Sequence, residues 1–74
     1  MQTYERHVVL EARQLLGITL EETFIRAYQY FWERPVSHAF ILRKFRQYMG
    51  SEQAPVPEEV EFWAIHILAG RISE

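Results

Sequence analysis

Hydrophobic side chains recur along this chain at intervals of three and four positions, in four stretches separated by helix-breaking residues. The stretches cover about 3–16, 20–33, 37–49 and 57 to between 69 and 71. Gly17 and Pro35 separate the first three, and Gly50 with the loop SEQAPVP separates the third from the fourth. Spacing of this kind is typical of amphipathic helices, whereas the alternation expected of a strand never persists. The pattern therefore predicts four helices and no strand.

Residues suited to helix ends stand where these stretches begin. Thr19 followed by Glu22 is the pattern of a capping box. Ser37 is placed to cap the third helix, and Pro57 suits the first position of the fourth. These positions agree with the limits that the hydrophobic pattern gives.

The apolar faces predict how the helices pack. The second helix has an apolar arc wide enough for a central helix with two or more neighbours; its main face is Leu20, Phe24, Ala27, Tyr28 and Phe31. For the third helix, we expect the inner face to be Ile41, Leu42, Phe45, Tyr48 and Met49. The prediction is an all-α single domain over 1–74, either a compact four-helix bundle or an orthogonal helical array.

Composition narrows the class of protein. The chain has 74 residues and no cysteine, so a thin core must hold without disulfides, and 49% hydrophobic residues indicate a folded chain. The formal net charge of −2 gives no general attraction for nucleic acid. Charges near the N-terminus interrupt any signal-peptide core, and no apolar run reaches the roughly 18 residues of a membrane span. We expect a soluble cytoplasmic protein without a membrane partner.

The inventory of reactive residues is poor in catalytic groups. The chain lacks aspartate and cysteine, and its three glycines stand too far apart for a phosphate-binding loop. His7 and Glu11 are four positions apart, which we interpret as an exposed side-chain pair, and His38 as a half-buried packing residue. The histidine spacings match no common metal motif. We therefore expect a protein that is not an enzyme and that has no cofactor and no metal.

The segment EARQLLGITLEETFIRAYQYF resembles the helix-turn-helix family of DNA readers, because its turn LLGIT is similar to the LLGIS of that family. Two features depart from the family pattern. Arg13 occupies the position, four before the turn glycine, where closely packed helices need a small residue. Glu21 and Glu22 lie where the recognition helix would meet phosphates, which they would repel. We therefore do not assign the chain to this family.

The third predicted helix carries a phenylalanine on its basic side. Residues 34–50 contain half of the eight lysines and arginines and no acid. Phe40 is either covered by the fourth helix or the loop 51–57, to which the stems of basic side chains can add, or it is an exposed anchor ringed by cations. The acidic stretch 52–61 could also neutralise this helix within the fold. The candidate partner-binding residues are Arg34, Phe40, Arg43, Lys44, Arg46 and Gln47.

The fourth predicted helix is apolar on two sides. One side is Val60, Ala64, Ile67 and Leu68, and the other is Phe62, Ile65 and Ala69. A terminal helix of this kind is either sandwiched between neighbours or half exposed, and a half-exposed apolar face marks an interface. Phe62, Ile65 and Ala69 are therefore the candidate oligomer interface.

These observations lead to two functional hypotheses. The first is a small non-catalytic helical protein–protein interaction module, or an accessory or regulatory factor, that binds a protein partner or itself. The alternative is a nucleic-acid-binding regulator that uses the basic helix 37–49, in which aromatic and cationic side chains could stack and neutralise a strand.

Overall fold

Four helices make up the fold in a computed structural model that describes residues 6–32, 34–51 and 54–72. They are α1 (His7–Leu16), α2 (Leu20–Phe31), α3 (His38–Met49) and α4 (Glu58–Leu68). The described residues form no strand, so the all-α prediction is confirmed. The predicted helical start at 3–5, the predicted helix end at Glu33 and the acidic Glu52 lie outside the described residues.

The predicted caps begin α2 and α3. Thr19 Oγ1 accepts a hydrogen bond from the Glu22 amide at 3.1 Å, and Ser37 Oγ accepts one from the Phe40 amide at 3.2 Å. Glu22 does not complete a capping box, because its carboxylate accepts from Arg26 Nε at 3.1 Å. Gly17 closes α1 with a φ of 70°, in the left-handed region that glycine adopts readily.

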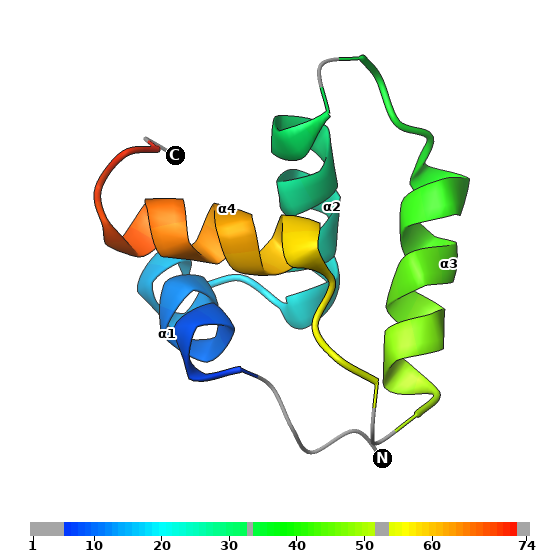
Figure 1. Cartoon of the computed structure of the whole chain (residues 1–74), viewed down its shortest axis with the longest axis horizontal. Helices are drawn as coiled ribbons and strands as arrows, with labels where there is room; N and C mark the ends of the chain where they lie inside the picture. The colour runs from blue at the N-terminus through cyan, green and yellow to red at the C-terminus, as the bar shows by residue number, and fades with distance from the viewer. Residues whose placement is uncertain (1–5, 33, 52–53, 73–74) are drawn as a thin grey trace.

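The helices form a chain of contacts in the order α1, α4, α2, α3. Figure 1 shows α4 running across α2, with α1 on one side and α3 alongside α2 on the other. α4 packs against α1 and α2, and α2 packs against α3 as well, which confirms the prediction that the second helix is central. The helices therefore form a crossed array, 31 × 27 × 19 Å in extent, instead of an aligned bundle.

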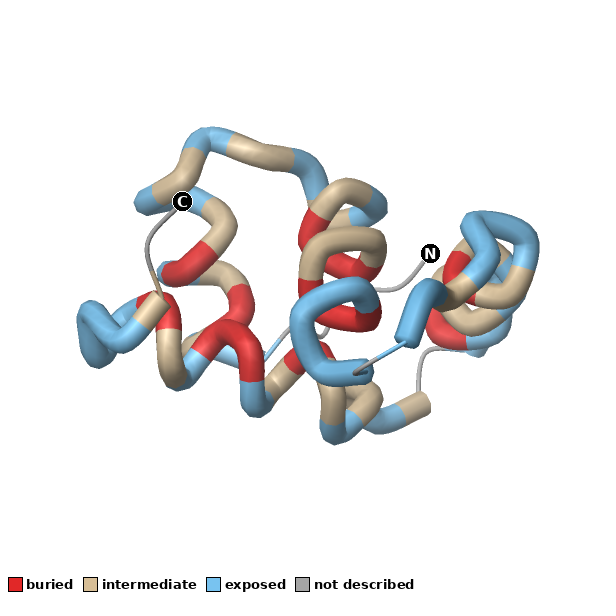
Figure 2. The backbone as a smooth tube through the Cα atoms, turned by 90° about the horizontal axis from the view of Figure 1, so that it is seen from above, coloured by how far each residue is buried: buried red, intermediate tan, exposed pale blue. Residues whose placement is uncertain are grey.

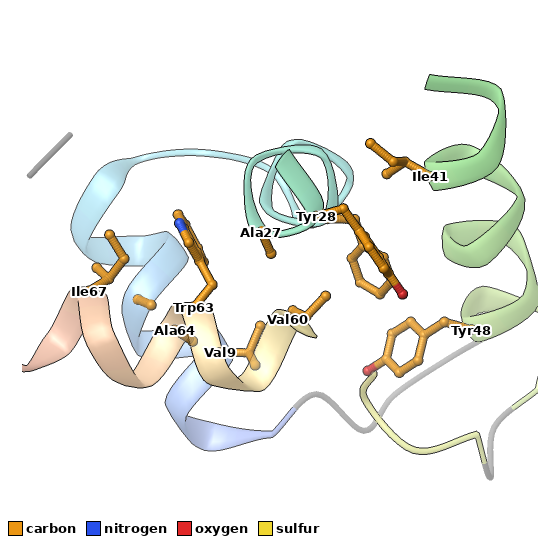
Figure 3. Close-up of a cluster of buried hydrophobic side chains, with 11 residues drawn as sticks. Val9, Ala27, Tyr28, Ile41, Tyr48, Val60, Trp63, Ala64 and Ile67 are labelled. Carbon is orange, nitrogen blue, oxygen red and sulfur yellow. The ribbon is translucent and has the colours of Figure 1, made fainter. Parts of the chain in front are cut away.

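The core has two connected parts, which Figure 2 shows as buried segments on the inner sides of the helices. Trp63 of α4 is fully buried where α4 meets α1 and α2, together with Val9 and Ala12. Between α2 and α3, the ring of Phe24 lies 5.4 Å from that of Phe45 and 5.5 Å from that of Tyr48. Figure 3 shows both parts, with Trp63 and Ile67 in the first and Tyr28 and Tyr48 in the second.

The buried face of α3 differs from the predicted one. Ile41 and Tyr48 are buried as expected, but Met49 is 37% exposed and Leu42 is only half-buried. Phe40 lies among the hydrophobic residues that pack against the core. The face is rotated toward Phe40 because α3 has one main neighbour, α2, and that neighbour presents Tyr28 to Phe40.

His38 is exposed, so its predicted packing role is wrong. Its Nε2 lies 3.3 Å from Nε2 of Gln29 on α2, at the surface.

None of the helices in the described part of the chain has the length and apolar character that a bilayer crossing requires.

Candidate interaction surfaces

The outer side of α4 carries exposed apolar side chains. Phe62 is 41% and Ile65 is 47% exposed, and Ala69 is exposed at the end of the helix. The sequence left two arrangements open for this helix, and the structure has the half-exposed one. The opposite side of the same helix is the core side, where Val60, Trp63 and Ala64 are fully buried.

Aromatic residues of α2 extend this surface beyond α4. The ring of Phe31, the last residue of α2, lies 5.4 Å from the ring of Phe62 and nearly perpendicular to it, at 85°. The ring of His66 also contacts Phe62, with ring centroids 4.3 Å apart. We call the exposed set Phe31, Phe62, Ile65, Leu68 and Ala69 the apolar patch.

Sequence reasoning missed two residues of this patch: Leu68, which it placed on the Val60 side of α4 and which is 40% exposed, and Phe31. Its helical spacing puts it on the main face of α2 with Phe24 and Tyr28, yet it is 38% exposed. It lies at the end of α2, where its one described inter-helix ring contact is with Phe62. Its position in the last turn was the available signal, because a helix end often extends past the neighbour that covers its middle.

Phe40 is half-buried, and three side chains surround its ring. The ring of Tyr28 meets it edge to face at 6.1 Å and 89°. Arg43 Cζ lies 5.5 Å and Lys44 Nζ 5.4 Å from its centroid, within the range of cation–π attraction. Phe40 therefore helps to attach α3 to α2, and its ring is already occupied by an aromatic edge and two cations.

The other residues of the predicted basic site are only partly brought together. Gln47 is exposed on the side of Phe40 and Arg43, whereas Arg46 lies about 120° around the helix from Phe40. Arg34 lies in the connection before α3. It lines a surface hollow of about 410 Å³ with Phe40 and Trp32.

A second hollow, of about 300 Å³, lies where α2, α3 and the start of α4 converge. Its lining is Tyr28, Lys44, Gln47, Tyr48, Ala54, Pro55, Pro57 and Glu59. Burial, with added contributions from the charge of Glu59 and a hydrogen bond to it, raises the pKa of Tyr28 to about 12. A phenol that keeps its proton this strongly does not serve as a general base near neutral pH.

Two further pairs of ionisable side chains lie at the surface, outside these hollows. His7 Nε2 contacts the Glu11 carboxylate on the exposed side of α1, as its spacing predicts, and Arg6 contacts Glu61 of α4. The pair of Arg6 and Glu61 links the start of α1 to the first turn of α4. Within the described ranges, no three histidine, cysteine, aspartate or glutamate side chains are grouped to hold a metal ion.

The α1–α2 pair is unlike the helix-turn-helix family in its packing. α1 and α2 make little direct contact, because each packs mainly against α4. Arg13 is half-buried, and Glu22 at the start of α2 pairs with Arg26.

Comparison with protein-family models, curated proteins and solved structures finds no match to this chain.

Proposed function

We propose that this protein is a small non-catalytic helical interaction module, and that the apolar patch is its protein-binding surface. The observation that supports this most directly is the contact between Phe31 and Phe62, two half-exposed aromatic rings from different helices. Exposed aromatic clusters of this kind supply the anchor residues of protein interfaces.

The arrangement of the patch suits a preformed binding surface. Phe62 lies on a helix whose opposite face is fully buried through Val60, Trp63 and Ala64, so its backbone is held by the core. The rings of Phe31 and His66 both pack against its ring, with centroids 5.4 Å and 4.3 Å away. Side chains that are ordered before binding lose less entropy when a partner covers them.

Photocrosslinking in the native cells tests this proposal. Phe62 is replaced by the photoreactive p-benzoylphenylalanine, which keeps an aromatic ring at the centre of the patch. Matched probes replace Gln14 on α1 and Arg43 on α3, which are both exposed and outside the patch. After irradiation, we expect a discrete protein adduct from position 62 and none from position 14.

The two remaining outcomes would count against the proposal. If the probe at position 43 gives the adduct and the probe at 62 does not, the functional surface is the basic side of α3. If no position gives an adduct in cells that contain the folded protein, the interaction function is wrong.

A further inference from the structure

The chain is acidic where α4 begins and carries a cation, Arg71, three residues after α4 ends, so opposite charges lie on either side of the apolar patch. Glu58, Glu59 and Glu61 occupy its first turn. From Phe62 to Ile72 the chain has no acid, and it carries His66 and Arg71. Because the helix dipole makes the N-terminal end favourable for anions, the acidic turn also stabilises α4 itself.

From this asymmetry we infer that the partner of the apolar patch is a second copy of this chain, bound with its α4 antiparallel to the first. The inference rests on the proposed function of the patch. A two-fold axis between Phe62 and Ile65 places Phe62 of each chain opposite Ile65 of the other, as a self-complementary interface requires. The acidic turn of each α4 then lies beside the end of its partner that leads to Arg71.

A parallel arrangement of the same two helices is unfavourable. It would place Glu58 of one copy beside Glu58 of the other, whereas Glu61 is already paired with Arg6 of its own chain. Like charges held close together destabilise an interface. It would also align the two helix dipoles, whereas the antiparallel pair sets each N-terminal end beside a C-terminal end. The charge pattern therefore selects one orientation.

The surface of the chain is large enough for a dimer interface of standard size. A standard interface covers about 800 Å² of each partner, which is about a sixth of the 5063 Å² surface of this chain. The exposed rings of Phe31 and Phe62, with Ile65 and Leu68, give such an interface an apolar centre drawn from two helices. A domain of this length also has a thin core, which an apolar interface extends.

Sedimentation equilibrium of the purified chain tests the association. At about 50 µM, where an interface of this size associates measurably, we expect a mass of twice the 8.9 kDa of the chain. Ile65→Glu should return the mass to that of the monomer, because it places a carboxylate at the centre of the interface. Leu15→Glu is the matched control. Leu15 is 67% exposed and outside the patch, so this variant should remain a dimer.

Single cysteines test the orientation, because the native chain has none. With a rise of 1.5 Å per residue, the two copies of residue 65 lie about 4–5 Å apart along an antiparallel pair, and those of residue 69 about 16 Å apart. A bis-maleimide shorter than the second distance should therefore crosslink the Ile65→Cys dimer and not the Ala69→Cys dimer. In a parallel pair, both variants would be crosslinked.

The results separate failure of this inference from failure of the proposed function. Efficient crosslinking through Ala69→Cys, or a dimer that survives Ile65→Glu, would overturn the antiparallel α4 pairing. A sharp monomer at all concentrations, together with an adduct from position 62 to a different protein in cells, would overturn self-association and leave the interaction function standing. A monomer without any adduct at position 62 would overturn both.

Discussion

At the scale of single residues, this core buries polar groups as well as apolar ones. Thr23 is fully buried, and its hydroxyl donates to the Thr19 carbonyl at 2.8 Å. Trp63 is also fully buried, but its indole N–H has no hydrogen-bond partner among the described residues. An unsatisfied donor of this kind costs about 1–3 kcal/mol, so Trp63 contributes through its packed ring.

Tyr28 gives a pH dependence that can be measured. Its phenol is buried and donates a hydrogen bond to Glu59, which raises its pKa from 10.0 to about 12. The folded state therefore holds this proton more tightly than the unfolded state does. The resulting stability is fully present below pH 10 and is lost as pH rises toward 12, by about 2–3 kcal/mol in total.

Urea denaturation at pH 9 and pH 11, followed by far-ultraviolet circular dichroism, checks this prediction. Tyr28→Phe is the control, since it keeps the ring and removes the titrating group, while the other tyrosines and the lysine titrate in both proteins. We expect the wild-type chain to lose more stability between these pH values than the variant. Equal losses would show that Tyr28 ionises as readily in the folded chain as in the unfolded one.

At the scale of helices, the sequence determined the positions of the elements better than the direction of their faces. Thr19 and Ser37 act as caps as predicted, because capping depends on a few adjacent residues. The inner face of α3 was predicted only in part: Ile41 and Tyr48 are buried as expected, but Met49 is exposed, because apolar side chains surround most of the helix. Which of these side chains becomes buried depends on the neighbouring helix. Tyr28 of α2 packs against Phe40, whereas Met49 is left exposed.

Substitutions at Phe40 test whether its ring packs α3 against α2 or forms part of a nucleic-acid-binding surface. Phe40→Ala should lower the free energy of unfolding by about 2 kcal/mol, less than for a fully buried ring, because it removes the contact with Tyr28. Phe40→Leu is the control and should lose less. Thermal melting measures both variants.

Titration of the wild-type chain with single-stranded and duplex oligonucleotides completes this test. Because the Phe40 ring is occupied by Tyr28, Arg43 and Lys44, we expect no measurable complex at physiological salt. A micromolar complex that weakens steeply with salt, and that Phe40→Ala abolishes without loss of folding, would instead establish a base-stacking site on α3.

At the scale of the whole molecule, part of the candidate surface could be predicted from the apolar pattern of α4. Phe62, Ile65 and Ala69 could be recognised because they form a second apolar stripe on α4, opposite the stripe that packs inward. For Phe31 the one signal was its position in the last turn of α2, since its exposure depends on where α4 crosses α2, which is a tertiary property. For the same reason, the pattern of apolar positions did not distinguish an aligned bundle from the crossed array.

The way the helices pack against one another predicts that α3 is the least stable part of the fold. α4 packs against two helices and buries Val60, Trp63, Ala64 and Ile67, whereas α3 packs mainly against α2 and buries Ile41 and Tyr48. Detaching α3 would leave the contacts among α1, α2 and α4 in place. Parts of a protein with fewer buried contacts open at lower free energy than the whole.

Native-state amide exchange at low protein concentration, with increasing denaturant, measures these openings. We expect the amides in the middle of α3 to exchange through an opening of lower free energy than those in α4. Ile41→Ala should accelerate exchange in α3 more than in α4, because Ile41 belongs to the α2–α3 part of the core. If α3 and α4 share one opening free energy, and Ile41→Ala lowers it equally in both, the four helices unfold as one cooperative unit. The number of helices that each helix packs against would then not determine its local stability.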